Sequence, residues 1–219
     1  SGDIDIVVRP EQIEQAAKLL LAEGYRNSDW LGYELTPRQR ELFKKLLMTH
    51  HFGFEHPGKK LHLELHQNFS TSLLLDDIEP LWKSTKREAW QGLSVTCLDD
   101  EALLLLLCFH GGIHHWVCLK WLSDVARLLV VAKTRDWARL LALADRMDLK
   151  RPLAQGALLS HWIYDIDLPS ELCNLIKNEK TAAALSAKAL TCILKSAVEL
   201  NVPGEGVSLI WRVKKLRPS

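Results

Sequence analysis

The strongest constraint on the fold is a change in hydrophobic periodicity near residue 99. Before it, short runs alternate apolar and polar residues, a pattern typical of half-buried β-strands. After it, as far as Leu200, apolar residues recur every three to four positions, which indicates amphipathic helices. The sequence therefore predicts an α+β protein, with a small mixed β-sheet core in residues 1–98 and an all-helical C-terminal half in residues 99–219.

The first strand-like run, Asp3 to Val8, alternates acidic residues with isoleucine and ends in two valines. We expect a strand with a buried apolar face, because successive side chains of a strand point to opposite sides. Residues Glu11 to Glu23 then have the apolar stripe of a helix. Pro10 is suited to its first turn and Gly24 to its end. A strand followed directly by a helix is consistent with the α+β assignment.

A β-hairpin is predicted further along the chain. Thr49 to Glu55 forms its first strand, and Leu61 to His66 forms its second, with a turn at 57–59. In the second strand His62, Glu64 and His66 alternate with leucine residues. These three polar side chains are therefore expected on one face of the sheet.

The remaining segments complete the prediction. Arg38–Leu47 is expected to hold a short helix, Leu74–Trp90 to be helical in part, and Leu93–Leu98 to be extended. The acidic run 99–101 suits a helix N-terminus, because the helix dipole places partial positive charge there. The later helices are expected at Trp121–Leu129, Trp137–Ala144 (capped by Thr134 or Asp136), Leu153–Tyr164, Ser170–Lys177 and Ala182–Leu200.

Charge and hydropathy narrow the class of protein. With 28 basic and 27 acidic residues, the net charge of +1 creates no global field that would attract nucleic acid. The longest apolar run, Ala102–Phe109, is much shorter than the roughly 20 residues of a membrane span. The five scattered cysteines form no CxxC pair, which favours reduced thiols. We therefore expect a soluble cytoplasmic protein.

The start at Ser1-Gly2-Asp3, without Met, leads us to expect a preceding N-terminal stretch.

Acidic residues supply the main functional candidate. Asp3 and Asp5 lie two apart on the first strand, so their carboxylates point to one face, roughly 7 Å apart. Two such groups raise each other's pKa unless a cation lies between them. Glu64 offers a third carboxylate from another strand. The three oxygen donors suit Mg²⁺, which binds carboxylates together with substrate phosphates. The alternative is an ordinary solvated strand end.

These motifs resemble a known family. The strand Gly2–Val8 and its helix are similar to the element that carries the paired acids in the polymerase-beta nucleotidyltransferase superfamily. Leu61–His66 resembles the strand of the third carboxylate in that superfamily. His110–Trp116 and Leu119–Asp124 resemble the helical part of one bacterial branch, the uncharacterised nucleotidyltransferases. The three motifs together span roughly 2–149.

The resemblance implies a nucleotidyltransferase-like core in which Asp3, Asp5 and Glu64 are the catalytic residues and hold one or two Mg²⁺ ions. It also implies transfer of a nucleoside monophosphate from a nucleoside triphosphate to a small-molecule or protein hydroxyl. The sequence departs from the superfamily at two points. In the superfamily a Gly-Ser turn normally stands about ten residues before the paired acids, whereas only Ser1 and Gly2 precede Asp3 here. The third acid of the superfamily is more commonly Asp, whereas this sequence has Glu64.

Further residues are candidates for nucleotide or acceptor binding. Arg9 follows the acidic strand, and His66 shares the face of Glu64. His110 and His114 lie four apart, the spacing of one helix face. The glycine pair 111–112 between them indicates a helix break or a close approach of backbone or of a ligand. Lys120 and Asp124 are also candidates, although with Arg127 they have the spacing of a surface ion-pair ladder.

Each candidate has a structural alternative, and so does the function. Trp116 and Trp121 are interpreted as core or domain-junction residues. His62 and His66 either orient Glu64 or contribute to metal binding, and otherwise pack across strands. Two functions compete with nucleotide transfer. One is a binding or regulatory relative without turnover, and the other is a transition-metal hydrolase built on His62, His66, His110 and His114.

Overall fold

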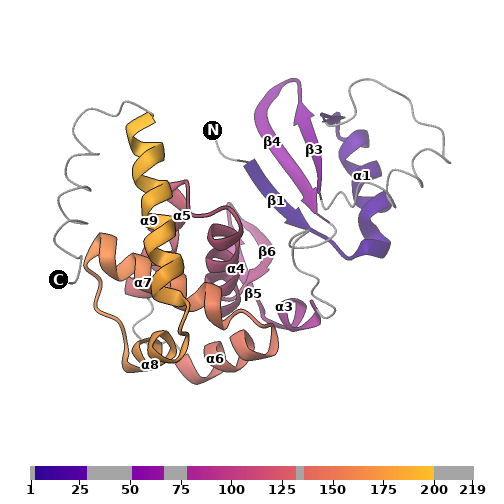
Figure 1. The fold of residues 1–219 in the computed structure, drawn as a ribbon. Helices are drawn as coiled ribbons and strands as arrows, with labels where there is room; N and C mark the ends of the chain where they lie inside the picture. The colour runs from indigo at the N-terminus through magenta and orange to yellow at the C-terminus, as the bar shows by residue number, and fades with distance from the viewer. Residues whose placement is uncertain (1–2, 29–50, 67–77, 132–135, 200–219) are drawn as a thin grey trace. The chain divides into compact units, whose positions relative to one another are not determined.

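The computed structural model describes residues 3–28, 51–66, 78–131 and 136–199 of the 219-residue chain (Figure 1). Contacts between residues divide the chain into a sheet unit, Ser1–Asp76, and a helical unit, Asp77–Ser219. A small mixed sheet precedes a largely helical region, so the predicted α+β class is confirmed. The division into a nucleotidyltransferase-like domain, residues 1–98, and a helical domain, residues 99–219, stays a prediction.

Four strands form the sheet of the first unit, in the order β1-β4-β3-β2. Strand β1 runs parallel to β4, whereas β3 is antiparallel to both β4 and β2, so the sheet is mixed as predicted. A 3₁₀ turn at Pro10–Gln12 leads from β1 into α1. The elements are β1 (Asp3–Val7), α1 (Ile13–Ala22), β2 (Arg26–Asn27), β3 (His51–His56) and β4 (Lys59–His66).

The predicted helix and hairpin both form in this unit. Helix α1 is followed by Gly24, whose φ of 86° is a conformation that glycine adopts without steric cost. The hairpin turn is closed by the backbone N–H of Gly58, which donates to Nδ1 of His56 at 3.0 Å. Residues 49 and 50 of the predicted first strand, and the predicted helix Arg38–Leu47, lie outside the described residues.

The alternation of residues along β4 separates a core face from a polar face. Leu63 and Leu65 are buried and pack with Phe54 of β3 and Ile13 of α1. The side chains of His62, Glu64 and His66 therefore lie on the opposite face of the sheet. Because β4 is flanked by β1 and β3, its polar face is positioned by strands on both sides.

The buried apolar face that is predicted for the run Asp3 to Val8 is met at Val8, which packs against the core, and is wrong for the two isoleucines. Ile4 and Ile6 are 39% and 38% exposed. Strand β1 is at the edge of the sheet, and α1 packs against β4 instead. The alternating sequence identified the strand correctly, but alternation does not show how far the covering helix extends.

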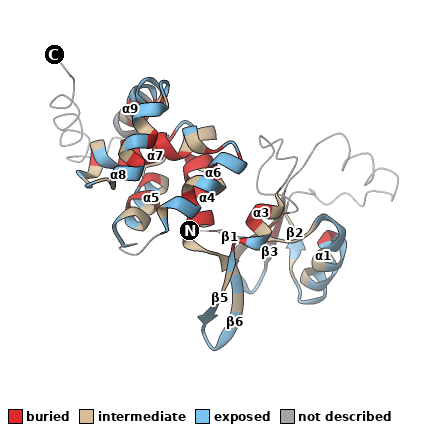
Figure 2. Ribbon diagram, turned by 90° about the horizontal axis from the view of Figure 1, so that it is seen from below, coloured by how far each residue is buried: buried red, intermediate tan, exposed pale blue. Residues whose placement is uncertain are grey.

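The helical unit is organised around one central helix, α7 (Lys150–Tyr164), in which every residue from Leu153 to Ser160 is buried (Figure 2). Helices α4, α5, α8 and α9 pack against it. The predicted helices are confirmed, with small shifts at their ends. The other helices are α3 (Glu79–Lys83), α4 (Asp100–Ile113), α5 (Leu119–Val131), α6 (Trp137–Arg146), α8 (Ser170–Asn178) and α9 (Ala182–Glu199).

The prediction that Leu74–Trp90 is helical in part is met by α3 within the described residues 78–90. Thr85–Trp90 forms β5, which pairs with β6 (Leu93–Leu98), the run predicted to be extended. The two-residue turn between them, Gln91-Gly92, has φ values of 48° and 80°. Positive φ at both central residues is the geometry of a tight hairpin. Gln-Gly is a weaker turn signal than Asn-Gly, which is why the hairpin was missed.

Acidic caps begin two of the helices. The Asp99 side chain accepts a hydrogen bond from the backbone N–H of Ala102 at 3.0 Å, as the acidic run predicted. Asp136, one of the two predicted caps, accepts from Arg139 N at 2.9 Å. The Arg139 guanidinium in turn donates to Asp99 and to Glu101, which raises the pKa of Arg139, mainly through the hydrogen bond with Asp99. This network joins the starts of α4 and α6.

The turn after α4 places Trp116 in the core. His115 and Trp116 both have left-handed backbone conformations, and the backbone N–H of Trp116 donates to the carbonyl of Gly111 at 2.8 Å. The Trp116 side chain is fully buried and lies against Gly111. The predicted core role of Trp116 is therefore confirmed. The group that approaches Gly111 is this side chain, whereas the glycine pair predicted backbone or a ligand, and α4 continues through both glycines without a break. In the parts of the chain that the structure covers, no helix is long and apolar enough to span a membrane.

Candidate metal centre

The register of two parallel strands brings together acids that are far apart in the sequence. The Cα atom of Asp5 on β1 is level with that of Glu64 on β4. Side chains of neighbouring strands that are level with one another point to the same face. The carboxylates of Asp5 and Glu64 therefore lie side by side on the polar face of the sheet, as the sequence predicted.

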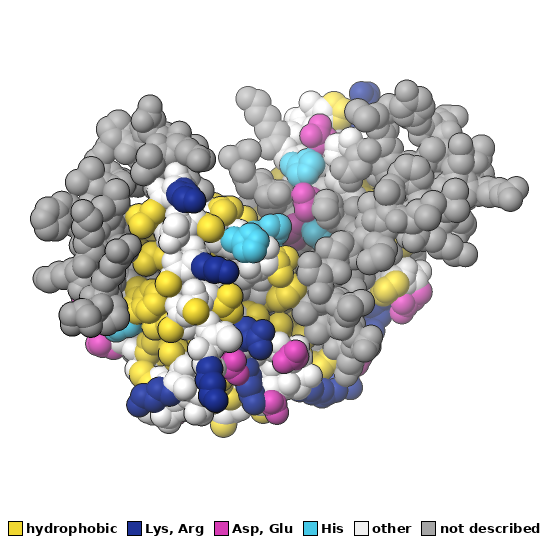
Figure 3. All heavy atoms as spheres, viewed as in Figure 1, with side chains coloured by type: hydrophobic (Ala, Val, Ile, Leu, Met, Phe, Trp, Pro, Cys, Tyr) yellow, Lys and Arg dark blue, Asp and Glu magenta, His cyan; other side chains and the backbone are white. Residues whose placement is uncertain are grey.

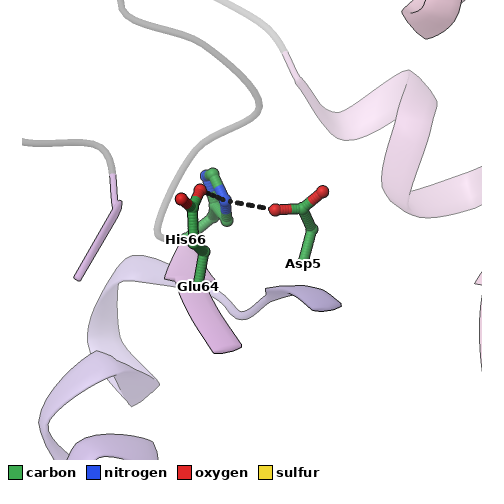
Figure 4. Close-up of side chains that lie close together, drawn as sticks. All are labelled: Asp5, Glu64 and His66. Atoms are coloured by element: carbon green, nitrogen blue, oxygen red, sulfur yellow. Dashed lines mark hydrogen bonds and ion pairs between the residues drawn. The ribbon is translucent and has the colours of Figure 1, made fainter. Parts of the chain in front are cut away.

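A third polar group completes the cluster. Nε2 of His66 lies 3.0 Å from Oδ1 of Asp5 and 3.3 Å from Oε2 of Glu64. One ligand atom from each of the three residues lies within 4.8 Å of the other two. Figure 4 shows the three side chains pointing toward one another, Asp5 from one strand and Glu64 and His66 from the other. We call Asp5, Glu64 and His66 the metal-site cluster.

The cluster is open to solvent on one side. The Asp5 side chain is 63% exposed, whereas those of Glu64 and His66 are 23% and 17% exposed. In Figure 3, acidic and histidine side chains gather next to one another on the surface of this unit. A half-buried carboxylate is less mobile and less screened than a fully exposed one. The site thus combines a fixed donor, Glu64, with a donor at the surface, Asp5.

Glu64 is held between two imidazoles. Nε2 of His62 lies 3.8 Å from Oε1 of Glu64, and His66 contacts the other carboxylate oxygen. Nδ1 of His62 also lies 3.5 Å from Oε1 of Glu55 on β3. The predicted role of the two histidines in orienting Glu64 therefore has a geometric basis, and His66 alone also contacts Asp5.

The other predicted residues of the sheet unit flank Asp5 along the chain, at the start of β1 and just after its end. Asp3 begins β1, with its backbone level with that of His62, and its side chain is outside the described part of the structure. Arg9 stands just after β1, where its carbonyl accepts from the backbone N–H of Gln12. The metal role of Asp3 and the phosphate contact of Arg9 stay predictions.

In the helical unit, the rings of His110, His114 and Trp121 contact one another. The ring centroids of the two histidines are 4.6 Å apart, and they lie 4.8 and 5.3 Å from that of Trp121. Lys120 is exposed and Asp124 half-buried on α5, and no ion pair joins them among the described residues. Their predicted contacts with a nucleotide are untested.

The observed cluster differs in two respects from the predicted set of Asp3, Asp5 and Glu64. The side chain of Asp3 lies outside the described part of the structure, and His66, for which both nucleotide contact and metal binding are predicted, lies with the two acids. The signal was in the sequence, because His66 follows Glu64 by two residues on a strand. Within the described ranges, the one group of three or more potential metal ligands excludes His62, His110 and His114. The structure thus gives the histidine-based hydrolase alternative no support.

Comparison with known proteins gives the family. The model of a family described as uncharacterised nucleotidyltransferase matches residues 1–165, which include β1, the metal-site cluster and the helices as far as α7. No curated protein and no solved structure matches the chain. The match covers well over half of the 219 residues and agrees with the resemblance carried by the acidic motifs. The chain therefore belongs to the uncharacterised nucleotidyltransferase family.

Proposed function

We propose that this protein is a Mg²⁺-dependent nucleotidyltransferase that moves a nucleoside monophosphate from a nucleoside triphosphate to a hydroxyl group of a small molecule or protein. The observation that carries this proposal is the convergence of Asp5 and Glu64 from separate strands, with ligand atoms less than 5 Å apart. Membership of a nucleotidyltransferase family supports the reaction class.

The donor set fits the ion that the family implies. Mg²⁺ prefers hard oxygen ligands and is commonly held by one or two carboxylates together with substrate phosphates. Asp5 and Glu64 would supply carboxylate oxygens, and Asp3 would supply another from the same strand as Asp5. Bound there, one or two Mg²⁺ ions would neutralise charge on the triphosphate and favour ionisation of the acceptor hydroxyl.

The reaction exchanges the phosphoanhydride bond between the α- and β-phosphates for a phosphodiester bond to the acceptor. The acceptor hydroxyl loses its proton to a carboxylate oxygen of the site, and its oxygen bonds to the α-phosphorus. The bond between that phosphorus and the bridging oxygen breaks, and pyrophosphate leaves with the electron pair. Catalysis of this step depends mainly on positioning and electrostatic stabilisation. Asp5 and Glu64 contribute by fixing the place where the phosphates bind.

The remaining candidates are proposed to bind nucleotide or acceptor. Arg9 and Lys120 carry positive charge suited to phosphate oxygens. His110 and His114, with Trp121, present aromatic surface suited to a planar ring. Asp124, half-buried near Lys120 on α5, is suited to hydrogen bonding with a hydroxyl. We propose that residues 1–98 form the domain that holds the reaction centre and Arg9, and that residues 99–219 form a helical domain that carries the other candidates.

Metal removal tests the proposal directly. The intact protein is incubated with each α-³²P-labelled nucleoside triphosphate, Mg²⁺ and pools of hydroxyl-bearing metabolites and proteins. We expect label transfer with release of pyrophosphate, complete loss of transfer in excess EDTA, and recovery when Mg²⁺ is returned. Absence of transfer with all four nucleotides, together with absence of divalent-ion binding in calorimetry, would contradict the proposal.

A further inference from the structure

We infer that the imidazole of His66 is a direct ligand of the bound cation, so that the site binds Mn²⁺ more tightly than Mg²⁺. The inference rests on the proposed function, because it concerns the same cation, and it adds a nitrogen donor to the carboxylates. The evidence is that Nε2 of His66 lies close to both acids, 3.0 Å from Oδ1 of Asp5 and 3.3 Å from Oε2 of Glu64.

The distances match those of adjacent ligands on one ion. In an octahedral complex with metal–ligand bonds of about 2.1 Å, neighbouring ligand atoms are about 3 Å apart. The two separations from Nε2 of His66 have this length, and all three ligand atoms lie within 4.8 Å of one another. A cation of this size therefore reaches all three donors with small side-chain adjustments.

The fold holds His66 in this position. His66 is at the end of β4, level with Val7 of the parallel neighbour, and its carbonyl accepts from the backbone N–H of Val8 at 2.9 Å. Its side chain is 17% exposed, the lowest exposure in the metal-site cluster. A donor fixed in advance loses little conformational entropy when it binds an ion.

The chemistry of the donor set determines which ions are favoured. Mg²⁺ takes oxygen ligands almost exclusively, whereas transition metals also bind imidazole nitrogen well. Mn²⁺ accepts the same carboxylate oxygens and octahedral geometry as Mg²⁺. A site with two carboxylates and one imidazole therefore favours Mn²⁺, and the nitrogen accounts for the difference.

Electron paramagnetic resonance of the Mn²⁺-loaded intact protein tests this inference without an activity assay. Spin-echo modulation at the frequencies of a coordinated ¹⁴N nucleus is expected in the natural protein and absent in His66→Gln. The matched control is His62→Gln, because His62 is on the same strand and face and also approaches Glu64, at 3.8 Å. We expect the nitrogen signal to remain in that control.

Ion affinity gives the second readout. Calorimetry should show Mn²⁺ bound at least about tenfold more tightly than Mg²⁺, and His66→Gln should remove most of that preference while changing Mg²⁺ affinity little. An equal loss for both ions, or Mn²⁺ binding that needs Asp5 and Glu64 but shows no ¹⁴N signal, would overturn the inference alone. Absence of any ion binding that depends on Asp5 would overturn the proposed function with it.

Discussion

Replacing Asp5 with Asn is expected to lower kcat of nucleotide transfer by about 1,000-fold, which corresponds to about 4 kcal/mol of lost transition-state stabilisation. The amide keeps the size of the side chain but removes the negative charge that attracts a cation beside Glu64. Because the Asp5 side chain is 63% exposed, the fold should tolerate the change. Rates of label transfer at saturating nucleotide and metal measure the effect.

Glu55→Gln is the matched control for this variant. Glu55 is also an exposed acid on the sheet, with a side chain 66% exposed, but it contacts His62 and is not part of the metal-site cluster. Its transfer rate should stay within about twofold of the natural protein, since loss of a solvated surface charge has little effect. Similar rates for Asp5→Asn and the natural protein would remove Asp5 from the catalytic machinery.

The largest expected effect on stability comes from Gly111→Ala in α4. A Cβ atom at this position would lie less than 3.0 Å from three ring carbons of the buried Trp116, closer than real Cβ contacts allow. Overpacking of this kind costs about 3 kcal/mol, and the better helix propensity of alanine returns only about 1 kcal/mol. Urea denaturation followed by far-ultraviolet circular dichroism should show a net loss of about 2 kcal/mol.

Gly112→Ala separates this clash from helix propensity. Among the described residues, a Cβ at position 112 would meet Oε1 of Gln155 alone, at 3.6 Å, which is ordinary van der Waals contact. We expect this neighbouring variant to be about 1 kcal/mol more stable than the natural protein. Equal stability of the two alanine variants would show that the packing of the Trp116 ring does not require glycine at position 111.

The elements that could be predicted are those with strong local signals. The acidic alternation identified β1, the leucine alternation identified β4, and the acidic run before residue 102 identified the start of α4. The hairpin of β5 and β6 could not be recognised, because its Gln-Gly turn and largely exposed strands lack both a turn signature and an apolar face. Exposure of Ile4 depends on tertiary cover, which local periodicity does not encode.

The part of the candidate site that lies on a single strand could be predicted from the alternation of residues. Alternation placed Glu64 and His66 on one face, and the family resemblance suggested that β1 is its neighbour. The register that sets Asp5 level with Glu64 arises from long-range strand pairing, which a single sequence does not determine. The contact between His66 and Asp5 arises from the same pairing of β1 with β4. It joins residues that are 61 positions apart in the chain, so it could not be predicted from the sequence either.

A double-mutant cycle in ion affinity tests most directly whether β1 and β4 hold one shared cation. Calorimetry would give the Mn²⁺ dissociation constants of the natural protein, Asp5→Asn, Glu64→Gln and the double variant. If both carboxylates bind the same ion, each single substitution weakens binding strongly, and the double variant loses much less than the sum of the two effects. Strictly additive losses, or a single substitution without effect, would contradict a shared site.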